Sequence, residues 1–212
     1  MGCAVPQPIF TIGHSNHPIE RFLELITMHG VEIVADVRSV PHSRLHPQYR
    51  RVALRRALQN SGVRYQFLGR ELGGRPEDPT AYVNQRVSYK RLAQTALFRS
   101  GIEHLLTLAP TSRVALVCAE KEPLDCHRTV LVARELVQEG ATVHHILADG
   151  ALEPHVNTLR RLRTRVGLPV ADLFASDDEL TAEAYTRQER RIAYVVRERS
   201  ATVWRETEIV AA

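Results

Sequence analysis

The sequence predicts a three-layer α/β fold, with a mainly parallel sheet flanked by helices and a C-terminal helical extension. Apolar, β-branched runs alternate with stretches of helical period, which is typical of parallel strands joined by helical crossovers. The clearest unit covers residues 114–147, where a strand, a polar loop, a helix and a second strand follow one another. Ligands of open α/β sheets bind outside the carboxyl ends of the strands, where that loop would lie.

Five strands are expected, because five short apolar runs each end at a polar or glycine-containing turn. They cover Ile9–Ile12, Val31–Val37, Val63–Leu68, Val114–Val117 and Val143–Leu147. Helices are expected between them, where apolar residues recur every three or four positions. They cover approximately Pro18–Gly30, Arg50–Asn60, Tyr82–Ala96, Phe98–Leu108 and Cys126–Gly140. Ser15 or Asn16 is a candidate N-cap of the first helix.

The alternation ends after Leu147, and two further helices are expected. A basic helix covers Pro154–Val166, and Ser176 followed by Glu179 is typical of a capping box that opens a terminal helix reaching about Arg199. We therefore expect one α/β domain over residues 1–168 and a helical extension over residues 169–212 that packs on it. An oligomerisation or partner-binding arm is the alternative for that extension.

Composition limits the class of protein. The 212 residues, 44% of them hydrophobic, are enough for one sizeable core. No apolar run approaches the roughly 18–20 residues that span a bilayer, and the N-terminus lacks the pattern of a secretory signal. The three cysteines then indicate reduced thiols in a cytoplasm, so we expect a cytoplasmic protein without a membrane partner. The oligomeric state is not readable.

Positive charge is concentrated in one segment, although the net charge is only +4. Between Asp36 and Glu71 there is no acidic residue, and the same stretch contains eight arginines. These are Arg38, Arg44, Arg50, Arg51, Arg55, Arg56, Arg64 and Arg70. Such a block favours an anionic partner, either a phosphate-bearing small molecule or a nucleic acid. The alternative is an ordinary solvated surface in an arginine-rich chain.

Two cysteines lie where α/β folds carry out chemistry. Cys126 is at the start of a helix, where unpaired backbone N–H groups and the neighbouring His127 and Arg128 favour a thiolate. It is a candidate nucleophile or metal ligand, against the alternative of an inert buried thiol. Cys118 ends a strand, and it is either a redox or metal partner of Cys126 or the last core residue of that strand.

Other reactive side chains follow the first two strands and should meet Cys118 at the same edge of the sheet. His14 is a candidate general base or metal ligand, against a structural loop histidine. Asp36 could orient His14 or Arg38 or bind a metal, against a salt bridge with Arg38. Glu120 is a candidate acid/base group. The candidate ligands of a divalent metal are His14, Asp36, Cys118, Glu120, Cys126 and His127.

The candidate substrate-binding residues are those able to hold an anion. Arginine recognises phosphate through its planar fork, and a helix start offers free N–H groups. The loop of residues 69–74 could bring its backbone close to a ligand, but it lacks the motifs that bind ATP or NAD. The set is Ser15, Arg38, Ser43, Gly73, Gly74, His127 and Arg128.

Several of these motifs, in this order, resemble those of the DUF488 family, a domain of unknown function. They are Thr11–Ser15, Asp36–Arg38 with Pro41 and Ser43, Leu72–Gly74, Cys118–Glu120 and Cys126–Arg128. The resemblance covers about Phe10 to Tyr194, and Asp172–Phe174 and residues 184–194 resemble the tail of some members. It implies an α/β fold and these site residues, but no reaction.

The leading hypothesis is an enzyme that acts on a phosphate-bearing substrate, a nucleotide or nucleic acid. Cys126 would be its nucleophile or metal ligand, with His14, Asp36 and Glu120 in proton transfer. A metal-dependent variant is the second enzymatic option. The rival hypothesis is a non-catalytic nucleic-acid-binding protein, in which the 38–70 block and the Arg160–Arg165 run form the surface and the cysteines are structural.

Overall fold

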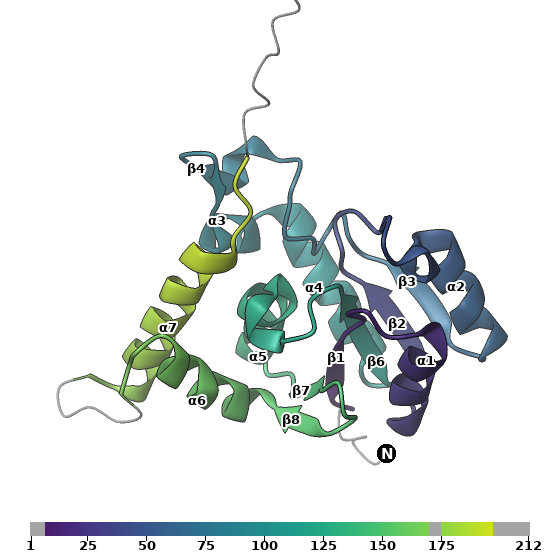
Figure 1. The fold of residues 1–212 in the computed structure, drawn as a ribbon. Helices are drawn as coiled ribbons and strands as arrows, with labels where there is room; N and C mark the ends of the chain where they lie inside the picture. Colours follow the sequence, from purple (N-terminus) through teal and green to yellow (C-terminus); the bar gives the residue numbers. More distant parts are fainter. Residues whose placement is uncertain (1–6, 170–174, 197–212) are drawn as a thin grey trace, which may run out of the picture.

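The computed structural model describes residues 7–169 and 175–196 (Figure 1). Its centre is a six-stranded sheet in the order β3-β2-β6-β1-β7-β8. The first five of these strands in space run parallel, and β8 pairs antiparallel with β7. The strands are β1 Ile9–Gly13, β2 Ile33–Asp36, β3 Arg64–Phe67, β6 Val114–Cys118, β7 Val143–Ile146 and β8 Leu152–Pro154. The predicted three-layer α/β fold with a mainly parallel sheet is confirmed.

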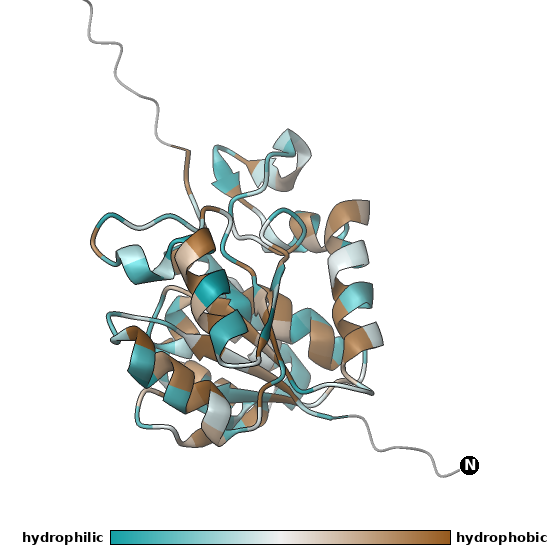
Figure 2. Cartoon of the chain, turned by 90° about the vertical axis from the view of Figure 1, so that its right-hand side faces the viewer, coloured by the Kyte–Doolittle hydropathy of each residue, from teal (hydrophilic) through white to brown (hydrophobic). Residues whose placement is uncertain are grey.

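Helices cover both faces of the sheet, as Figure 1 shows. One face is covered by α1 Ile19–Met28 and α2 Arg51–Asn60, whose buried residues include Phe22, Leu25 and Leu54. The other is covered by α4 Ala96–Leu108, the π-helical turn Arg128–Ala133 and α5 Arg134–Gln138. Figure 2 shows apolar and hydrophilic residues alternating along the helices, as expected for helices that bury one stripe.

Two helices follow the last parallel strand. α6 is His155–Arg165 and α7 is Asp177–Ile192, and the two pack against each other. Both halves of the predicted capping box of α7, between Ser176 and Glu179, are present. α7 ends at Ile192, short of the expected Arg199, because Ala193 is extended (φ −61°, ψ 137°) and Val195 bridges Arg86. Asp172–Phe174 and the residues beyond 196 lie outside the described residues. No helix in the described parts of the chain is long and apolar enough to cross a bilayer.

The helix expected over Tyr82–Ala96 is wrong in its first part. A 3-10 turn at Pro79–Ala81 leads into a hairpin of β4 Tyr82–Val83 and β5 Arg86–Val87, and only α3 Tyr89–Ala93 is helical there. The two turn residues, Asn84 and Gln85, have positive φ angles of 47° and 62°, which a helix cannot accommodate. The hairpin is extended by the far end of the chain, since Arg86 forms a bridge with Val195.

Two smaller expectations also need correction. Neither Ser15 nor Asn16 caps α1, because Ser15 has a positive φ of 50° and the N-cap residue is Pro18. Strand β8 was not expected, because its three residues show no apolar alternation. It forms because the turn at Gly150, with φ of 98°, folds the chain back onto β7.

A buried polar chain connects the two terminal helices to the sheet. The hydroxyl of Thr11 on β1 is hydrogen-bonded to His145 Nδ1 on β7 (2.7 Å), and His145 Nε2 is hydrogen-bonded to His155 Nδ1 on α6 (3.0 Å). His155 Nε2 is hydrogen-bonded to the hydroxyl of Tyr185 on α7 (2.8 Å). His145 is therefore a structural residue, which ties layers of the fold together.

Candidate functional site

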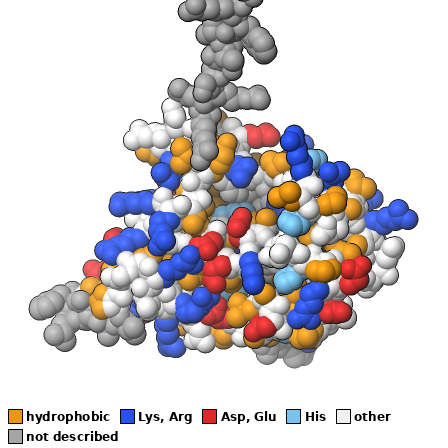
Figure 3. Space-filling model, in the orientation of Figure 1, with side chains coloured by type: hydrophobic (Ala, Val, Ile, Leu, Met, Phe, Trp, Pro, Cys, Tyr) orange, Lys and Arg blue, Asp and Glu red, His pale blue; other side chains and the backbone are white. Residues whose placement is uncertain are grey.

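A cavity of about 670 Å³ opens at the carboxyl edge of the sheet. The loops after β1, β2 and β6 form most of its wall, as expected for an open α/β sheet. The rest of the wall comes from Gly74, Arg75, Tyr89 on α3, Ile192 at the end of α7, and Tyr194 just beyond it. Figure 3 shows a hollow near the middle of one face, with histidine side chains in it and beside it.

Two thiols and an imidazole meet in this cavity. Sγ of Cys118 lies 3.7 Å and Sγ of Cys126 lies 3.8 Å from Nδ1 of His127. All three ligand atoms lie within 4.8 Å of one another, and both cysteines are buried. We call Cys118, Cys126 and His127 the Cys2His cluster.

The orientation of the His127 ring is fixed from two sides. Its Nε2 donates a hydrogen bond to the backbone carbonyl of Val37 (3.0 Å), which leaves the lone pair of Nδ1 directed at the two sulfurs. Gly74 packs on the ring so closely that a Cβ at this position would lie 2.9 Å from Cγ of His127. The sequence singled out Gly74 for a close backbone approach, and the neighbour that it approaches is this ring.

The local sequence explains why the two cysteines face each other. Cys118 is the last residue of β6 and pairs with Gly13 on β1. Cys126 follows the 3-10 turn Pro123–Asp125, and its carbonyl accepts from the N–H groups of Thr129 and Val130, which begin the next helix. The intervening loop is held by Arg128, whose guanidinium donates to the carbonyls of Glu120 (2.6 Å) and Lys121 (3.3 Å).

The two thiols differ in acidity. Burial raises the pKa of Cys126, but a hydrogen bond from Cys118 and the charge of Arg128 outweigh it and hold that pKa well below its ordinary value. The pKa of Cys118 is raised well above the ordinary value, because its thiol donates that hydrogen bond and is itself buried. The opposite directions of these two pKa shifts make Cys126 the more acidic thiol of the pair. Burial, and next the charge of Cys126, raise the pKa of the nearby Glu120.

His14 lines the cavity, but both of its ring nitrogens are occupied. Nδ1 donates to the carbonyl of Ser15 (2.8 Å), Nε2 accepts from Nη1 of Arg38 (3.2 Å), and the ring stacks on Tyr49 at 4.0 Å. Burial, followed by the charge of Arg38, lowers the pKa of His14 to about 4. At neutral pH this imidazole is uncharged and positions Arg38, and it lies outside the group that could hold a metal.

Asp36 does not line the cavity. Its carboxylate is fully buried and accepts from Nε (2.8 Å) and Nη2 (2.6 Å) of Arg38 and from the hydroxyl of Tyr65 (2.8 Å). Of the roles considered for it, the structure shows the salt bridge that orients Arg38. The guanidinium of Arg38, held also by the carbonyl of Tyr49, reaches the cavity wall.

The remaining candidates divide into two groups. Ser15, Ser43 and Glu120 line the cavity, whereas Gly73 and Arg128 do not. Arg128 is fully buried and holds the loop after β6, so its guanidinium is not free for a ligand. Gly73 is a packing residue, because a Cβ there would lie 2.3 Å from both the carbonyl of Gly69 and the hydroxyl of Ser39.

Sequence reasoning did not single out Arg75 or Tyr194, which also line the cavity. The guanidinium of Arg75 lies over the Tyr194 ring, 4.8 Å from its centroid. They are 119 positions apart, and the hydrogen bond from Val87 N to the carbonyl of Tyr194 (2.9 Å) helps to hold the C-terminal segment there. No local pattern in the sequence signals this contact.

Comparison with known proteins gives one finding. The family model described as domain of unknown function DUF488 matches residues 18–134, which include the whole Cys2His cluster but not His14. No curated protein and no solved structure matches the chain. The match covers more than half of the 212 residues. The chain therefore belongs to the DUF488 family.

Proposed function

We propose that this protein is a metal-dependent hydrolase that acts on a phosphate-bearing substrate, a nucleotide or nucleic acid. The metal would be a zinc-like divalent ion held by Cys118, Cys126 and His127. The observation that carries the proposal is the convergence of two sulfurs and one imidazole nitrogen in a cavity large enough for such a substrate. Cavities of about 300–1,000 Å³ typically hold small ligands.

The geometry of the cluster fits the donor set of zinc. With Zn–S near 2.3 Å and Zn–N near 2.0–2.1 Å, tetrahedral coordination separates sulfur from nitrogen by about 3.6 Å. The observed separations are 3.7 and 3.8 Å. The hydrogen bond from His127 to the Val37 carbonyl is the kind that orients a metal-bound histidine. Three protein ligands leave a fourth position for water, as in catalytic zinc sites.

The cavity provides the remaining chemistry. A zinc ion held by Cys118, Cys126 and His127 would supply Lewis-acid chemistry and a water of lowered pKa as the nucleophile. Glu120, whose pKa is raised by burial, would act as the general acid/base that takes up the proton of the attacking water and returns it to the leaving group. Lys121, and the one N–H on Nη2 of Arg38 that is not used within the protein, line the same cavity and would bind the phosphate of the substrate.

The lowered pKa of Cys126 supports a second candidate, thiol catalysis without a metal. Metal content and activity together separate it from the first. The protein is purified without an affinity tag, its metal content is measured by mass spectrometry, and hydrolysis of a nucleotide and oligonucleotide panel is assayed before and after chelation. We expect about one zinc-class ion per chain, and activity that is lost with the metal and restored by Zn²⁺.

Variants identify the ligands. Cys126→Ser and His127→Gln should lose the metal, and His14→Gln, in the same cavity but outside the cluster, should keep it. A chain that neither contains metal nor takes up added Zn²⁺ would overturn the metal proposal. Full activity of metal-free protein that alkylation abolishes would establish thiol catalysis. Unchanged nucleic-acid binding by Cys126→Ser, with no hydrolysis of any substrate by the wild type, would favour the non-catalytic alternative.

A further inference from the structure

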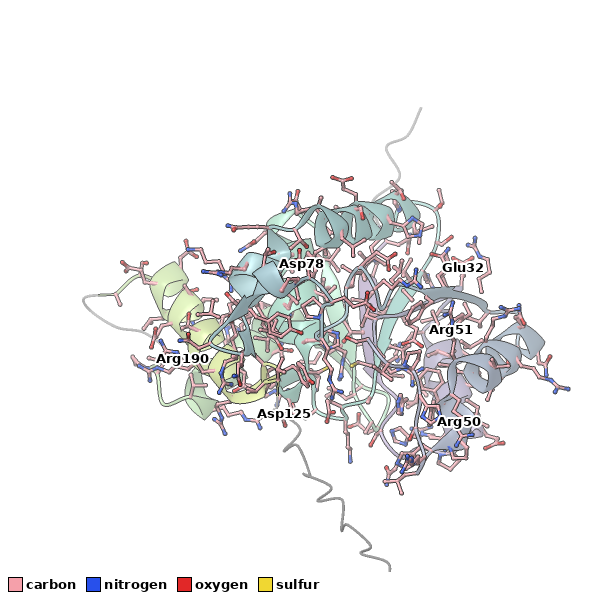
Figure 4. The ribbon with its side chains drawn as sticks, turned by 90° about the horizontal axis from the view of Figure 1, so that it is seen from above. Glu32, Arg50, Arg51, Asp78, Asp125 and Arg190 are labelled. Atoms are coloured by element: carbon pink, nitrogen blue, oxygen red, sulfur yellow. The ribbon has the colours of Figure 1, made fainter. Side chains whose placement is uncertain are left out.

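An arginine-rich surface lies beside the cavity without acidic partners. It consists of five exposed residues from the loop after β2 and from the start and first turns of α2, and we call it the α2 arginine surface. The five are Arg44, Arg50, Arg51, Arg55 and Arg56. Among the described residues, no carboxylate forms a salt bridge with any of them. Figure 4 places Arg50 and Arg51 on the side of the molecule that α2 forms.

The second basic run of the chain, on α6, is different. Arg161 binds the carboxylates of Glu122 (2.9 Å) and Glu153 (2.7 Å), and Arg165 binds that of Asp125 (2.7 Å). Arg163 is buried and paired with Asp177. These charges are used to hold α6 against its neighbours. Three of the four arginines of the α6 run are thus paired with carboxylates, whereas none of the five on the α2 arginine surface forms a salt bridge within the described residues.

The uncompensated charge works against the stability of α2. Arg51 and Arg55 are four positions apart, so they occupy the same face of the helix and repel each other. A glutamate at either position would be favourable for the isolated helix. Three exposed apolar side chains, Val40, Leu45 and Val52, are 62%, 86% and 80% accessible among these charges. An anionic partner with apolar faces matches both features, and a nucleic-acid strand has phosphates, sugars and bases.

The α2 arginine surface is continuous with the cavity. The loop that carries Arg44 also supplies Ser39, His42, Ser43 and His46 to the cavity wall. A cavity of about 670 Å³ has room for a nucleotide, whereas a double helix is too wide to reach thiols that are buried within it. Enzymes that act within duplexes extrude one nucleotide, and a single strand needs no such step.

We propose that the α2 arginine surface binds the phosphodiester backbone of a single-stranded nucleic acid and leads one of its nucleotides into the cavity. This inference deepens the proposed function, because it names a polymeric substrate for the same site. That the bound nucleotide is also hydrolysed rests on the proposed function, whereas the binding of the single strand does not.

The test is fluorescence anisotropy with a labelled 20-nucleotide single strand, the full chain and a series of salt concentrations. Arg44→Glu/Arg55→Glu reverses two positive charges whose guanidinium groups form no hydrogen bond or salt bridge with the described residues. Lys90→Glu/Arg160→Glu makes the same charge change on exposed residues outside the α2 arginine surface. We expect at least a tenfold weaker affinity for the first pair and less than a twofold change for the second. Because each phosphate contact contributes about −0.7 to the slope of log K against log salt, the first pair should reduce that slope by about 1.4.

Three results would overturn the inference: equal losses in both pairs, unchanged binding in the first pair, or tighter binding of a duplex than of the single strand. Arg44→Gln/Arg55→Gln, with Tm measured for each variant, serves if the charge reversal prevents folding. The metal content of each variant is measured in parallel. If the first pair of substitutions abolishes strand binding but leaves the metal content unchanged, the α2 arginine surface acts independently of the Cys2His cluster. If the inference fails while the metal is still bound, the proposed function is not affected.

Discussion

Substitution of Gly74 by alanine tests whether the His127 ring is held in position for a ligand. The new methyl carbon would lie 2.9 Å from Cγ, 3.2 Å from Cβ and 3.3 Å from Nδ1 of His127. Ordinary contact begins near 3.4 Å, so Cγ of the ring and the methyl group must separate by about 0.5 Å. The ring cannot follow freely, because its Nε2 is bound to the carbonyl of Val37.

The size of the effect follows from the tolerance of metal coordination. Metal–ligand distances hold to about ±0.2 Å, so a shift of about 0.5 Å at the imidazole exceeds what the site can absorb without moving both sulfurs. Changes to groups that orient a metal-binding histidine typically cost 10–100-fold in affinity, which corresponds to about 1.4–2.7 kcal/mol. We expect Gly74→Ala to weaken Zn²⁺ binding by this factor.

The assay is competition for Zn²⁺ with a chromophoric chelator at pH 7, with the free energy of unfolding measured on the same samples. Gly140→Ala is the matched control, because nothing lies within 4 Å of a Cβ there while its positive φ of 84° makes alanine strained. The control should lose about 1 kcal/mol of stability with wild-type Zn²⁺ affinity. Wild-type affinity in Gly74→Ala would refute the argument that packing against Gly74 positions His127.

Three further predictions concern the buried polar groups. Asp36→Asn should destabilise the protein by about 3–5 kcal/mol in urea unfolding, since it leaves the buried Arg38 without its counter-charge; a loss below 1 kcal/mol would contradict this role. Burial lowers the pKa of His14 and His155 from 6.5 to about 4, so the unfolded chain binds more protons between these values. The free energy of unfolding should therefore fall as the pH drops from 6.5 to 4, by up to about 3 kcal/mol per histidine, and the curve should flatten in His14→Gln/His155→Gln. Tyr185→Phe should cost about 1 kcal/mol through the lost hydrogen bond to His155, measured by thermal unfolding, and an unchanged Tm would count against it.

The sequence predicts those parts of the fold that depend on local pattern. Parallel strands such as Val114–Cys118 are buried throughout, and a short apolar run between polar turns is enough to recognise them. The hairpin of β4 and β5 depends on residues more than 100 positions away, since Arg86 bridges to Val195, and no local pattern contains that information. Its turn at Asn84 and Gln85 carries no glycine to mark it.

The candidate site shows the same division. Strand order explains why Asp36 and Cys118 lie near the same edge, but side-chain direction decides which of them can reach the cavity. Side chains two positions apart on a strand point to the same face of the sheet. Asp36 therefore points to the same face as Val34, which packs against α1 and α2, whereas Cys118 points to the opposite face, with Leu116. The sequence shows that side chains alternate between the two faces of a strand. It does not show which face borders the cavity, because that depends on how the helices pack on the sheet.

The cavity around the two cysteines depends on residues near the end of the described chain. Ile192, the last residue of α7, and Tyr194, just beyond it, form part of the cavity wall, and α7 is connected to the sheet through Tyr185, His155 and His145. Truncation of the chain after residue 168 would leave Nε2 of His155 without the hydroxyl of Tyr185. It would also remove the part of the cavity wall that Ile192 and Tyr194 form. Removal of a segment more than 40 positions from Cys126 in the sequence would therefore increase the exposure of the two buried thiols to water.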